Sequence, residues 1–555
     1  MAKEIMTAWQ RLMGLLRLDK RDVFQVFYYA IFAGLVNLSL PLGIQAIINL
    51  IQGAQVSTSW IVLVVLVTLG VAFVGILQLM QIRIIENVQQ KIFTRASFEF
   101  AYRFPKIKMS ELRDNYPPEL ANRFFDILNV QKGLPKLLID FPAALLQIVF
   151  GLLLLSFYHP FFIIYGILLI ILIYIVFKFT VQKGLVTSLA ESKSKYKVAH
   201  WIQEIARSII SFKLSGRTSH ALDKSDTLVD KYLIARESHF RILVLQFVQM
   251  IGFKILVTAG LLIIGGLLVL NQEMNIGQFV AAEIIILLVI ASVEKLILGL
   301  ESFYDVLTSL EKLGQVVDKK LEPQDGEKSF RPNENFTVEL DNVSYHIPGS
   351  DKKIIDGVSL TITPTCTILL QGPNGSGKTT LLRLIAGIVE PTEGDIFVNN
   401  VSLKGLHLNY YRAHLGQSLA EESPFEGTLS DNITFGDSSI SSDQIYWAIE
   451  KSGLSQFVKE QKNGLKTFIY PEGKQISNTI AKKIVLARSI VRKPKMLILK
   501  DPFDHFDMDE ATRLMDFLTD STNSWSLVVV SQNMAWADRC SRILTLEKGK
   551  LTSEK

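Results

Sequence analysis

The sequence predicts an all-α membrane region of six transmembrane helices with long cytosolic extensions, followed by a soluble α/β domain. Long apolar runs fill roughly the first 300 residues, and the mean hydropathy of the chain is +0.29. Basic residues gather in two long loops between these runs. Further along, short apolar strands alternate with helical patterns, as in a soluble domain. We therefore expect a transmembrane domain over 1–320, a linker over 321–335 and a second domain over 336–555.

Six apolar runs are long enough to cross a bilayer, which takes about 20 residues. The first run contains Asn37 and Pro41 and is the weakest by hydropathy alone. Only Tyr158, His159 and Pro160 separate the third run from the fourth, which predicts a tight hairpin. The predicted spans lie near residues 24–50, 59–82, 137–157, 159–179, 243–270 and 277–300.

The distribution of basic residues predicts the orientation of the spans. The loops near residues 83–136 and 183–241 are rich in lysine and arginine, whereas the other three connections contain neither. By the positive-inside rule, both basic loops and both chain termini are cytosolic. We expect a multi-pass protein of the inner (plasma) membrane. Glu86, Glu294 and Lys295 lie near span ends and are interpreted as interfacial.

Apolar periodicity continues into both basic loops, which predicts helices that extend beyond the membrane. Tyr116–Arg123 and Ser211–Gly216 interrupt this pattern, and we expect a short transverse helix at each, placed to rest on a cytosolic partner domain.

The first 22 residues predict an amphipathic helix on the membrane surface rather than a cleaved signal peptide. Cys366 and Cys540 have no CxxC or histidine partners, so we expect buried reduced thiols. The net charge of +5 is small for 555 residues, and no nucleic-acid partner is expected.

A phosphate-binding loop is the most specific motif in the chain. The apolar strand Thr365–Leu370 runs into GPNGSGKTT and then into the helix LLRLIAGIV, the strand–loop–helix context that GxxxxGK[ST] requires. Glycines let backbone N–H groups curl around phosphate oxygens, and the helix N-terminus adds its dipole. Lys378 is expected to reach the β- and γ-phosphates of ATP, and the Thr379 hydroxyl to coordinate magnesium. The predicted ATP-binding residues of this loop are Gly372, Pro373, Asn374, Gly375, Ser376, Gly377, Lys378, Thr379 and Thr380.

Six spans, long cytosolic loops and a downstream phosphate loop together resemble the half-transporters of the ATP-binding-cassette (ABC) exporter family, and most closely the bacterial type I secretion and peptide-export group. The resemblance covers nearly the whole chain. It implies that two halves pair and that ATP is sandwiched between the phosphate loop of one and the signature loop of the other. The cysteine-protease domain that opens some members is not expected, because only about twenty residues precede the first span.

Several motifs of that family are altered in this sequence. Ile347 stands where the family has an aromatic residue that stacks on adenine. Ala420 occupies the position of the glutamine that links magnesium to the membrane domain, although Gln417 lies nearby. The signature LSGGQ reads Ile476-Ser-Asn-Thr-Ile480, in which Ser477 survives as a residue that would contact nucleotide in trans. Asn478 adds a side chain where the family brings glycine backbone close to a γ-phosphate.

The catalytic end of the domain departs further from the family. The strand Met496–Leu499 is followed by Lys500 and Asp501, where the family has Asp-Glu, and Gln532 replaces the switch histidine. The loop Asp504–Asp507 keeps only its last aspartate. At the position of Lys500, the family has an aspartate whose carboxylate anchors magnesium, and this chain has a cation there. Asp501 is one methylene shorter than glutamate, and a misplacement of about 1 Å can cost on the order of 100-fold in rate.

Asp501 and Gln532 are nevertheless the residues expected at the catalytic positions. We expect ATP to bind with doubtful magnesium dependence. Lys500 either contributes to nucleotide binding by replacing part of the charge of the ion, or points away toward Asp501, Asp504 or solvent.

Two functions are compatible with the sequence. The first is a half-transporter that exports a peptide, protein or lipid-like substrate as a homodimer or heterodimer, with a periplasmic adaptor as a further partner. The second is a catalytically inactive pseudo-ATPase that acts as a membrane scaffold or regulator. The rate of ATP hydrolysis separates them.

Overall fold

The computed structural model of the chain describes residues 6–52, 58–113, 115–216, 219–328, 336–347, 352–419 and 422–554. The chain forms two compact units. The first comprises Met1–Lys106 and Asp114–Lys319, and the second comprises Ile107–Arg113 and Lys320–Lys555. The segment Ile107–Arg113, in the first basic loop, therefore folds with the C-terminal part of the chain.

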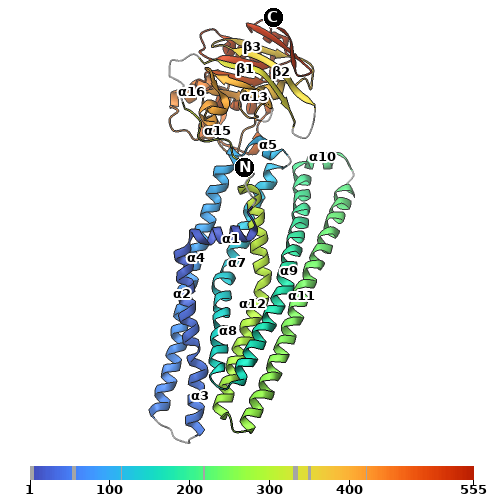
Figure 1. Cartoon of the computed structure of the whole chain (residues 1–555). Coiled ribbons are helices and arrows are strands. Elements are labelled where there is room, and N and C mark those ends of the chain that lie inside the picture. Colours follow the sequence, from blue (N-terminus) through green and yellow to red (C-terminus); the bar gives the residue numbers. More distant parts are fainter. Residues whose placement is uncertain are drawn as a thin grey trace. The chain divides into compact units, whose positions relative to one another are not determined.

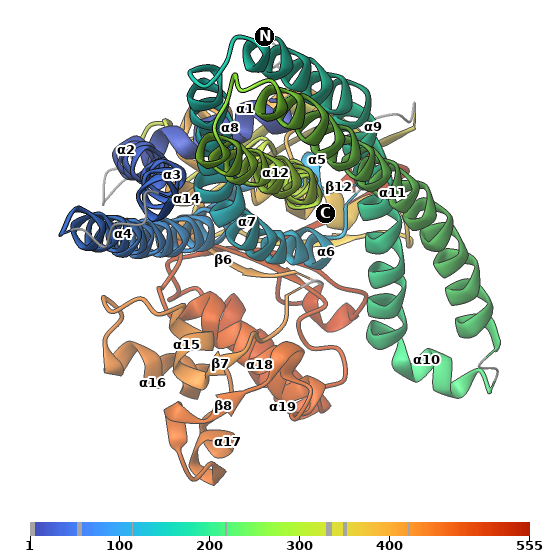
Figure 2. The same cartoon turned by 90° about the horizontal axis from the view of Figure 1, so that it is seen from below.

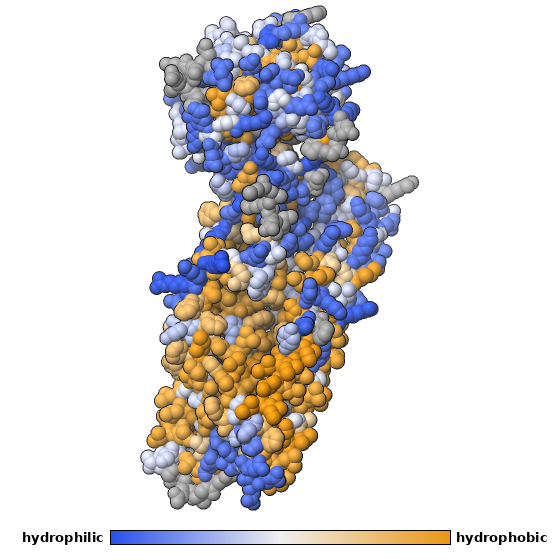
Figure 3. All heavy atoms as spheres, viewed as in Figure 1, coloured by the Kyte–Doolittle hydropathy of each residue, from blue (hydrophilic) through white to orange (hydrophobic). Residues whose placement is uncertain are grey.

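The first unit contains six helical segments that are long and apolar enough to cross a membrane, as predicted. Figure 1 shows them as an elongated bundle, and Figure 3 shows apolar residues covering much of the visible face of these helices. The segments extend over Lys20–Ile51, Thr58–Lys106, Pro117–Ser156, Phe161–Arg207, Ser219–Leu270 and Ile276–Val317.

Four of the helices run far beyond the length that a bilayer requires. They are α4 (Thr58–Arg103), α9 (Phe161–Arg207), α11 (Ser219–Leu270) and α12 (Ile276–Val317), with 46, 47, 52 and 42 residues. At 1.5 Å per residue, about 20 residues cross the apolar core, so each helix continues well outside it. The predicted extensions are therefore present.

The first span is broken in two, into α2 (Lys20–Asn37) and α3 (Ser39–Gln52). Pro41 explains the break, because it has no N–H to donate to the carbonyl group of Asn37 one turn earlier. At the break, the Leu38 N–H donates to the carbonyl oxygen of Leu35, three residues earlier, at 3.2 Å. The predicted hairpin between the third and fourth spans is also present, between α8 (Phe141–Ser156) and Phe161.

The last span is the central helix of the first unit. Figure 2 looks along the bundle and shows α12 beside α8 and α11. It also contacts α9, α3 and α7 (Asp126–Pro135). Its small and branched residues, such as Ala281, Ala282 and Val289, are fully buried in these contacts.

The short helices of the two basic loops differ in part from the expectation. The helix expected near Ser211–Gly216 is present as α10 (Ile209–Leu214), and its contact with a partner domain stays a prediction. In the first loop, the segment that folds with the second unit contains α5 (Met109–Leu112) and precedes the predicted Tyr116–Arg123. The predicted segment instead forms α6 (Pro117–Asn122), whose Leu120 is buried within the first unit. Two adjacent prolines favour the start of a helix there but do not indicate which domain the helix contacts.

The predicted N-terminal helix is α1 (Ala8–Leu18). Thr7 caps it in a capping box with Gln10, which fixes its first turn. Trp9, Met13 and Leu18 are exposed large apolar side chains on this helix. Its location on a membrane surface remains a prediction, which these exposed residues favour.

The second unit is an α/β domain with a six-stranded main sheet, ordered β12–β11–β3–β10–β9–β6. All neighbours in it are parallel except β12, which is antiparallel to β11. An antiparallel sheet, ordered β2–β1–β4–β5, and the short pair β7–β8 complete the domain. The strands of the main sheet are β3 (Thr367–Gln371), β6 (Leu415–Ser418), β9 (Met496–Lys500), β10 (Ser526–Val530), β11 (Arg542–Glu547) and β12 (Lys550–Glu554). The other strands are β1 (Val338–His346), β2 (Lys353–Ile362), β4 (Glu393–Val398), β5 (Val401–Ser402), β7 (Gly427–Thr428) and β8 (Phe468–Ile469).

Helices cover both faces of the main sheet. Successive residues of a strand point to opposite faces, so Met496 and Ile498 pack with α13 (Lys378–Ile385), whereas Leu497 and Leu499 pack with α18 (Asn478–Ile490). Figure 2 shows a separate group of helices around α18. This group consists of α15 (Leu429–Thr434), α16 (Ser442–Lys451), α17 (Ser455–Glu460) and α19 (Met508–Thr519), and α14 (Leu408–Ala413) lies next to β6.

Part of the predicted linker is held firmly by the second unit. The Glu322 carboxylate, with 8% of its side chain exposed, accepts two hydrogen bonds from Arg412, at 2.7 and 2.9 Å. The Glu327 N–H donates to the Gly405 carbonyl group at 2.8 Å. Residues 329–335 of the linker lie outside the described residues. Cys366 and Cys540 are free, and each is half-buried rather than fully buried as expected.

Candidate functional site

The phosphate loop joins β3 to α13 at the carboxyl edge of the main sheet, as its sequence predicted. Gly372, Gly375 and Gly377 have φ angles of 140°, 80° and 108°, which glycine adopts far more easily than other residues. A Cβ at Gly372 would lie 2.1 Å from the carbonyl oxygen of Leu546, so no larger residue fits there. Such a loop turns successive backbone N–H groups toward one point and forms an anion cradle.

Two side chains of the loop have polar groups that phosphate oxygens could satisfy. The Ser376 hydroxyl is buried, and it has no hydrogen-bond partner among the described residues. The Lys378 ammonium is folded back and donates to the carbonyl oxygens of Gly372 and Pro373, at 2.7 and 2.8 Å. Burial and the Lys500 ammonium lower the pKa of Lys378, whereas Asp501 opposes that change. These groups fit a bound triphosphate, whose negative charge would favour the ammonium form.

A cavity of about 330 Å³ opens over this loop. Most of its walls come from the ends of three neighbouring parallel strands, because β10 pairs with both β3 and β9, and Ile354 of β2 adds a further side chain. This pairing places Lys500 opposite Val530 and brings the end of β9 beside the phosphate loop. The lining residues include Asn374, Gly375, Gly377, Lys378, Thr379, Thr380, Lys500, Asp501 and Gln532.

Lys500, the last residue of β9, and Asp501, which follows it, therefore lie in the same cavity as the phosphate loop. Asp501 has a φ of 44°, and its backbone is fixed by an N–H···O bond of 2.8 Å to Val530 and by the Lys482 ammonium on its carbonyl oxygen, also at 2.8 Å. Burial raises the pKa of the Asp501 carboxyl group, and the Asp504 carboxylate raises it further, whereas three nearby lysines lower it. The carboxylate is thus harder to ionise than a free aspartate.

Other predicted site residues differ in how close they come to this cavity. The Gln532 side chain donates to the Asn374 side-chain oxygen at 3.2 Å and so reaches across the phosphate loop. Ser477 caps α18 by accepting a hydrogen bond from the Ile480 N–H at 3.2 Å and is not among the lining residues. Gln417 lies on β6 and does not line the cavity either. Ala420 lies outside the described residues.

The residues present fit a triphosphate better than they fit its usual metal ion. Hard divalent cations bind oxygen ligands, which are usually carboxylates. Within the described ranges, no group of three or more histidine, cysteine or acidic residues could hold a metal ion. In the cavity, Thr379 offers a hydroxyl group and Asp501 a carboxylate, and the Lys378 and Lys500 ammonium groups line the same cavity. Two cations beside one carboxylate that is hard to ionise disfavour a bound divalent cation.

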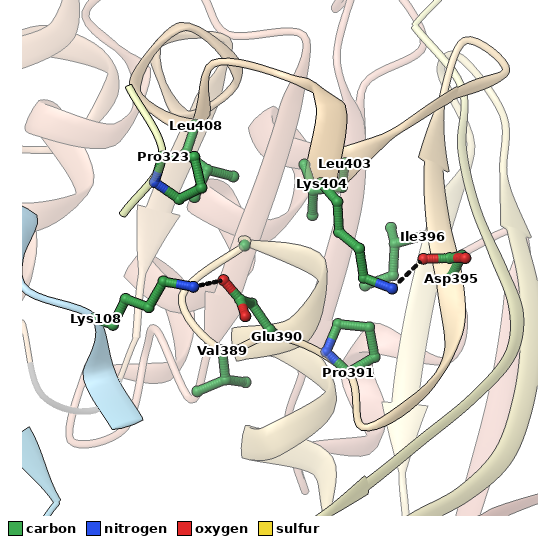
Figure 4. Close-up of a pocket in the computed structure, with 11 residues that line it drawn as sticks. Lys108, Pro323, Val389, Glu390, Pro391, Asp395, Ile396, Leu403, Lys404 and Leu408 are labelled. Atoms are coloured by element: carbon green, nitrogen blue, oxygen red, sulfur yellow. Dashed lines mark hydrogen bonds and ion pairs between the residues drawn. The ribbon is translucent and has the colours of Figure 1, made fainter. Parts of the chain in front are cut away.

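A second hollow of about 250 Å³ lies elsewhere in the second unit, near Ile107–Arg113 (Figure 4). The Lys108 ammonium contacts the Glu390 carboxylate at 2.7 Å, and Ile107 forms a β-bridge with Leu321. Figure 4 also shows the Lys404–Asp395 ion pair on the other side of this hollow. These contacts attach a piece of the first basic loop to the second unit.

Sequence reasoning missed two ionic contacts in the membrane region. Glu294 and Lys295 were interpreted as interfacial, but Lys254, inside the fifth span, was overlooked. The Lys254 ammonium lies 2.6 Å from the Glu294 carboxylate, and Lys295 lies 3.2 Å from Asp140. A lysine within an apolar run was the available signal, since such residues are rare and usually paired.

The comparisons with known proteins agree with this architecture. The model of the ABC transporter transmembrane region matches residues 23–293, and the ABC transporter model matches residues 355–504. The alpha-hemolysin translocation ATP-binding protein HlyB of Escherichia coli O157:H7 is 25% identical over 309 residues, which are 56% of this chain and 43% of that protein. The ATP-dependent lipid A-core flippase of Burkholderia orbicola is 26% identical over 284 residues, which are 51% of this chain and 48% of that protein. A putative export ATP-binding/permease protein of Rickettsia bellii is 24% identical over 363 residues, which are 65% of this chain and 63% of that protein.

The matched segments therefore span less than two thirds of each of these relatives. The structure of a bacterial Atm1-family ABC exporter with ATP bound is similar in fold over 96% of this chain and 95% of that one, with a TM-score of 0.85 and 17% identity. With one membrane region of six spans and one nucleotide domain, the chain belongs to the ABC transporter family and has the architecture of an exporter half-transporter.

Proposed function

We propose that this chain is one half of an exporter of the inner (plasma) membrane that works as a dimer and moves a peptide, protein or lipid-like substrate outward. The names of relatives support this range, since one translocates alpha-hemolysin and another flips lipid A-core. The basic loops support cytosolic chain termini. A periplasmic adaptor is a further partner in this proposal, by analogy with the type I secretion group.

We further propose that the nucleotide site binds ATP but hydrolyses it slowly. The observation that carries this proposal is that Lys500 and Asp501 line the same cavity as Lys378. Hydrolysis needs a carboxylate that orients water and a site that neutralises developing charge. Here the carboxylate belongs to Asp501, which is one methylene shorter than glutamate and hard to ionise. The site also carries Lys500 at the position where the family has a metal-binding aspartate.

The Lys500 ammonium is proposed to replace part of the charge of magnesium. Its position in the cavity favours this role over one in which it points to solvent. ATP affinity should then fall little when magnesium is chelated. We expect a larger fall in Lys500→Asp, with Lys500→Met as the uncharged control. If the natural chain loses affinity on chelation as sharply as Lys500→Asp, the charge-replacement proposal fails.

ATP hydrolysis by the full chain in lipid nanodiscs tests the central proposal. The variant Lys500→Asp/Asp501→Glu/Gln532→His restores the three family residues and should hydrolyse ATP at least about 10-fold faster. The same variant with Lys378→Ala should lose that gain. A natural chain that already turns over at about 10 s⁻¹, a typical enzyme rate, would show that the altered residues do not slow hydrolysis.

The second candidate, a pseudo-ATPase scaffold or regulator, is favoured by Asn478 in the signature loop. In a homodimer this loop would face the phosphate loop of the other half, so both composite sites would be altered. Hydrolysis that stays at background in the natural chain, with every tested partner half present, would favour this role over export driven by the chain itself.

A further inference from the structure

We propose that a cavity between α8 and α12 binds the anionic headgroup of a phospholipid of the inner leaflet, and that the tails of this lipid lie along the same two helices. The cavity has a volume of about 330 Å³ and lies wholly within the first unit. The proposal rests on the predicted orientation of the spans and is independent of nucleotide binding. The lining residues are Lys136, Asp140, Phe141, Ala291, Glu294, Lys295, Leu298 and Gly299.

The charged groups in and beside this cavity share one level along the membrane helices. Lys295 lies about 19 residues from Ile276, the outer end of α12 in the predicted topology, and such a length of helix rises about 28 Å. Lys254 lies about 16 residues from Leu270, the outer end of α11, or about 24 Å. The apolar core of a bilayer is about 30 Å thick. The charged groups therefore lie near its cytosolic boundary, where the headgroups of the inner leaflet begin.

One positive charge in the cavity has no acidic partner. Lys295 pairs with Asp140 at 3.2 Å, and Glu294 pairs with Lys254 at 2.6 Å, so these four charges cancel. The Lys136 ammonium donates to a serine hydroxyl of α12 at 2.8 Å and forms no ion pair with any described residue. The cavity therefore attracts an anion. Basic pockets between membrane helices on the cytosolic side are typical sites for anionic lipid headgroups.

The wall that carries this lysine has an unusual backbone. Lys136–Asp140 is a π-helical segment, in which the Phe141 N–H donates to the carbonyl oxygen of Lys136, five residues earlier. Pro142 follows and has no N–H to donate to the preceding turn. The segment places both Lys136 and Asp140 on the cavity wall. π-helical turns are rare and frequently lie at functional sites, which supports a binding role for this wall.

Exposed apolar side chains continue from the cavity toward the middle of the bilayer. On α8, Leu145 and Val149 are 54% and 52% exposed, and Leu145 lies four residues after the lining residue Phe141. On α12, Leu287 is 55% exposed and lies four residues before the lining residue Ala291. Residues four apart lie on one face of a helix. A charged cavity that continues into an apolar surface fits a lipid better than a free anion.

Native mass spectrometry of the full chain in detergent measures the binding. The probes are phosphatidylglycerol, which is anionic, phosphatidylcholine, which is zwitterionic, and glycerol phosphate, which has a phosphate group but no tails. We expect phosphatidylglycerol to bind at least about fivefold more tightly than phosphatidylcholine, because each lysine near an anionic lipid strengthens binding by about that factor. Glycerol phosphate should bind at least about 100-fold more weakly than phosphatidylglycerol, because it has no tails to bury.

Variants of single lysines locate the site. Lys136→Met removes the uncompensated charge without breaking an ion pair, so its affinity for phosphatidylglycerol should fall by at least about fivefold while its melting temperature stays unchanged. Lys136→Arg keeps the charge and should bind as the natural chain does. Lys178→Met is the matched control, because Lys178 lies about 17 residues, or about 25 Å, from the outer end of α9 but does not line the cavity. It should keep the full affinity.

Each other outcome overturns the proposal. Equal affinity for the two lipids would show that the cavity does not select an anionic headgroup. An unchanged affinity in Lys136→Met, or an equal loss in Lys178→Met, would place the binding elsewhere on the basic surface. Glycerol phosphate that binds as tightly as phosphatidylglycerol would indicate a site for a free anion. Selective binding to the monomer that disappears in the dimer would show that a second copy of the chain covers the cavity.

Discussion

The ion pair between Glu322 and Arg412 tests how the nucleotide domain holds the segment that follows the last membrane helix. Both Arg412 Nη atoms lie within 2.9 Å of the Glu322 carboxylate oxygens, and Arg412 Nη2 also donates to the Gly387 carbonyl group. Arg412→Leu leaves a buried carboxylate without its partner, which costs about 3–5 kcal/mol. We expect the melting temperature of the domain to fall by about 6–20 °C, because 1 kcal/mol shifts a domain of this size by about 2–4 °C.

A double-mutant cycle separates the ion pair from general damage. Glu322→Leu/Arg412→Leu removes both charges, so the free energy of unfolding should fall by at least about 2 kcal/mol less than the sum of the two single losses. Thermal unfolding of the full chain in nanodiscs, followed by tryptophan fluorescence, measures each variant. Lys404→Leu is the control, because its ion pair with Asp395 is largely exposed and contributes under about 1 kcal/mol. Strictly additive losses in the double variant would refute the reasoning.

Further predictions concern other parts of the chain. Arg488 donates to the backbone and side-chain oxygens of Asn432 at 2.8 and 3.0 Å, so Arg488→Leu should destabilise the domain by about 2–4 kcal/mol in thermal unfolding, and Arg488→Lys by less. Burial raises the pKa of the Cys540 thiol to about 12, so mass spectrometry should show alkylation at pH 8 at least about 100-fold slower than for an exposed cysteine; equal rates would contradict the burial. A cysteine at Ser59 should react with an impermeant maleimide on intact cells and one at Ser192 should not, since labelling at Ser192 from outside would overturn the predicted topology. Mass photometry in a native-like bilayer should give twice the chain mass of 62.4 kDa, and an active monomer would exclude the dimer.

The features that the sequence predicted well depend on local patterns. Apolar runs identified all six membrane helices, because crossing a bilayer requires about 20 consecutive apolar residues. The phosphate loop was located to the residue, since its glycines and Lys378 work only at fixed spacing between a strand and a helix. Pro41 marked the weak point of the first span, where the helix is interrupted.

Tertiary structure alone decided which distant residues meet. Glu322 and Arg412 are 90 positions apart, and Lys254 meets Glu294 from a neighbouring helix, so no local spacing reports either pair. The same applies to α5, which folds with the second unit while the more conspicuous Pro117–Asn122 stays with the first. Lys500 was recognised in the sequence, but only the register of β9 against β10 brings it into the cavity of the phosphate loop. Burial and partner choice depend on how separate elements pack, and that information is not contained in any short stretch of sequence.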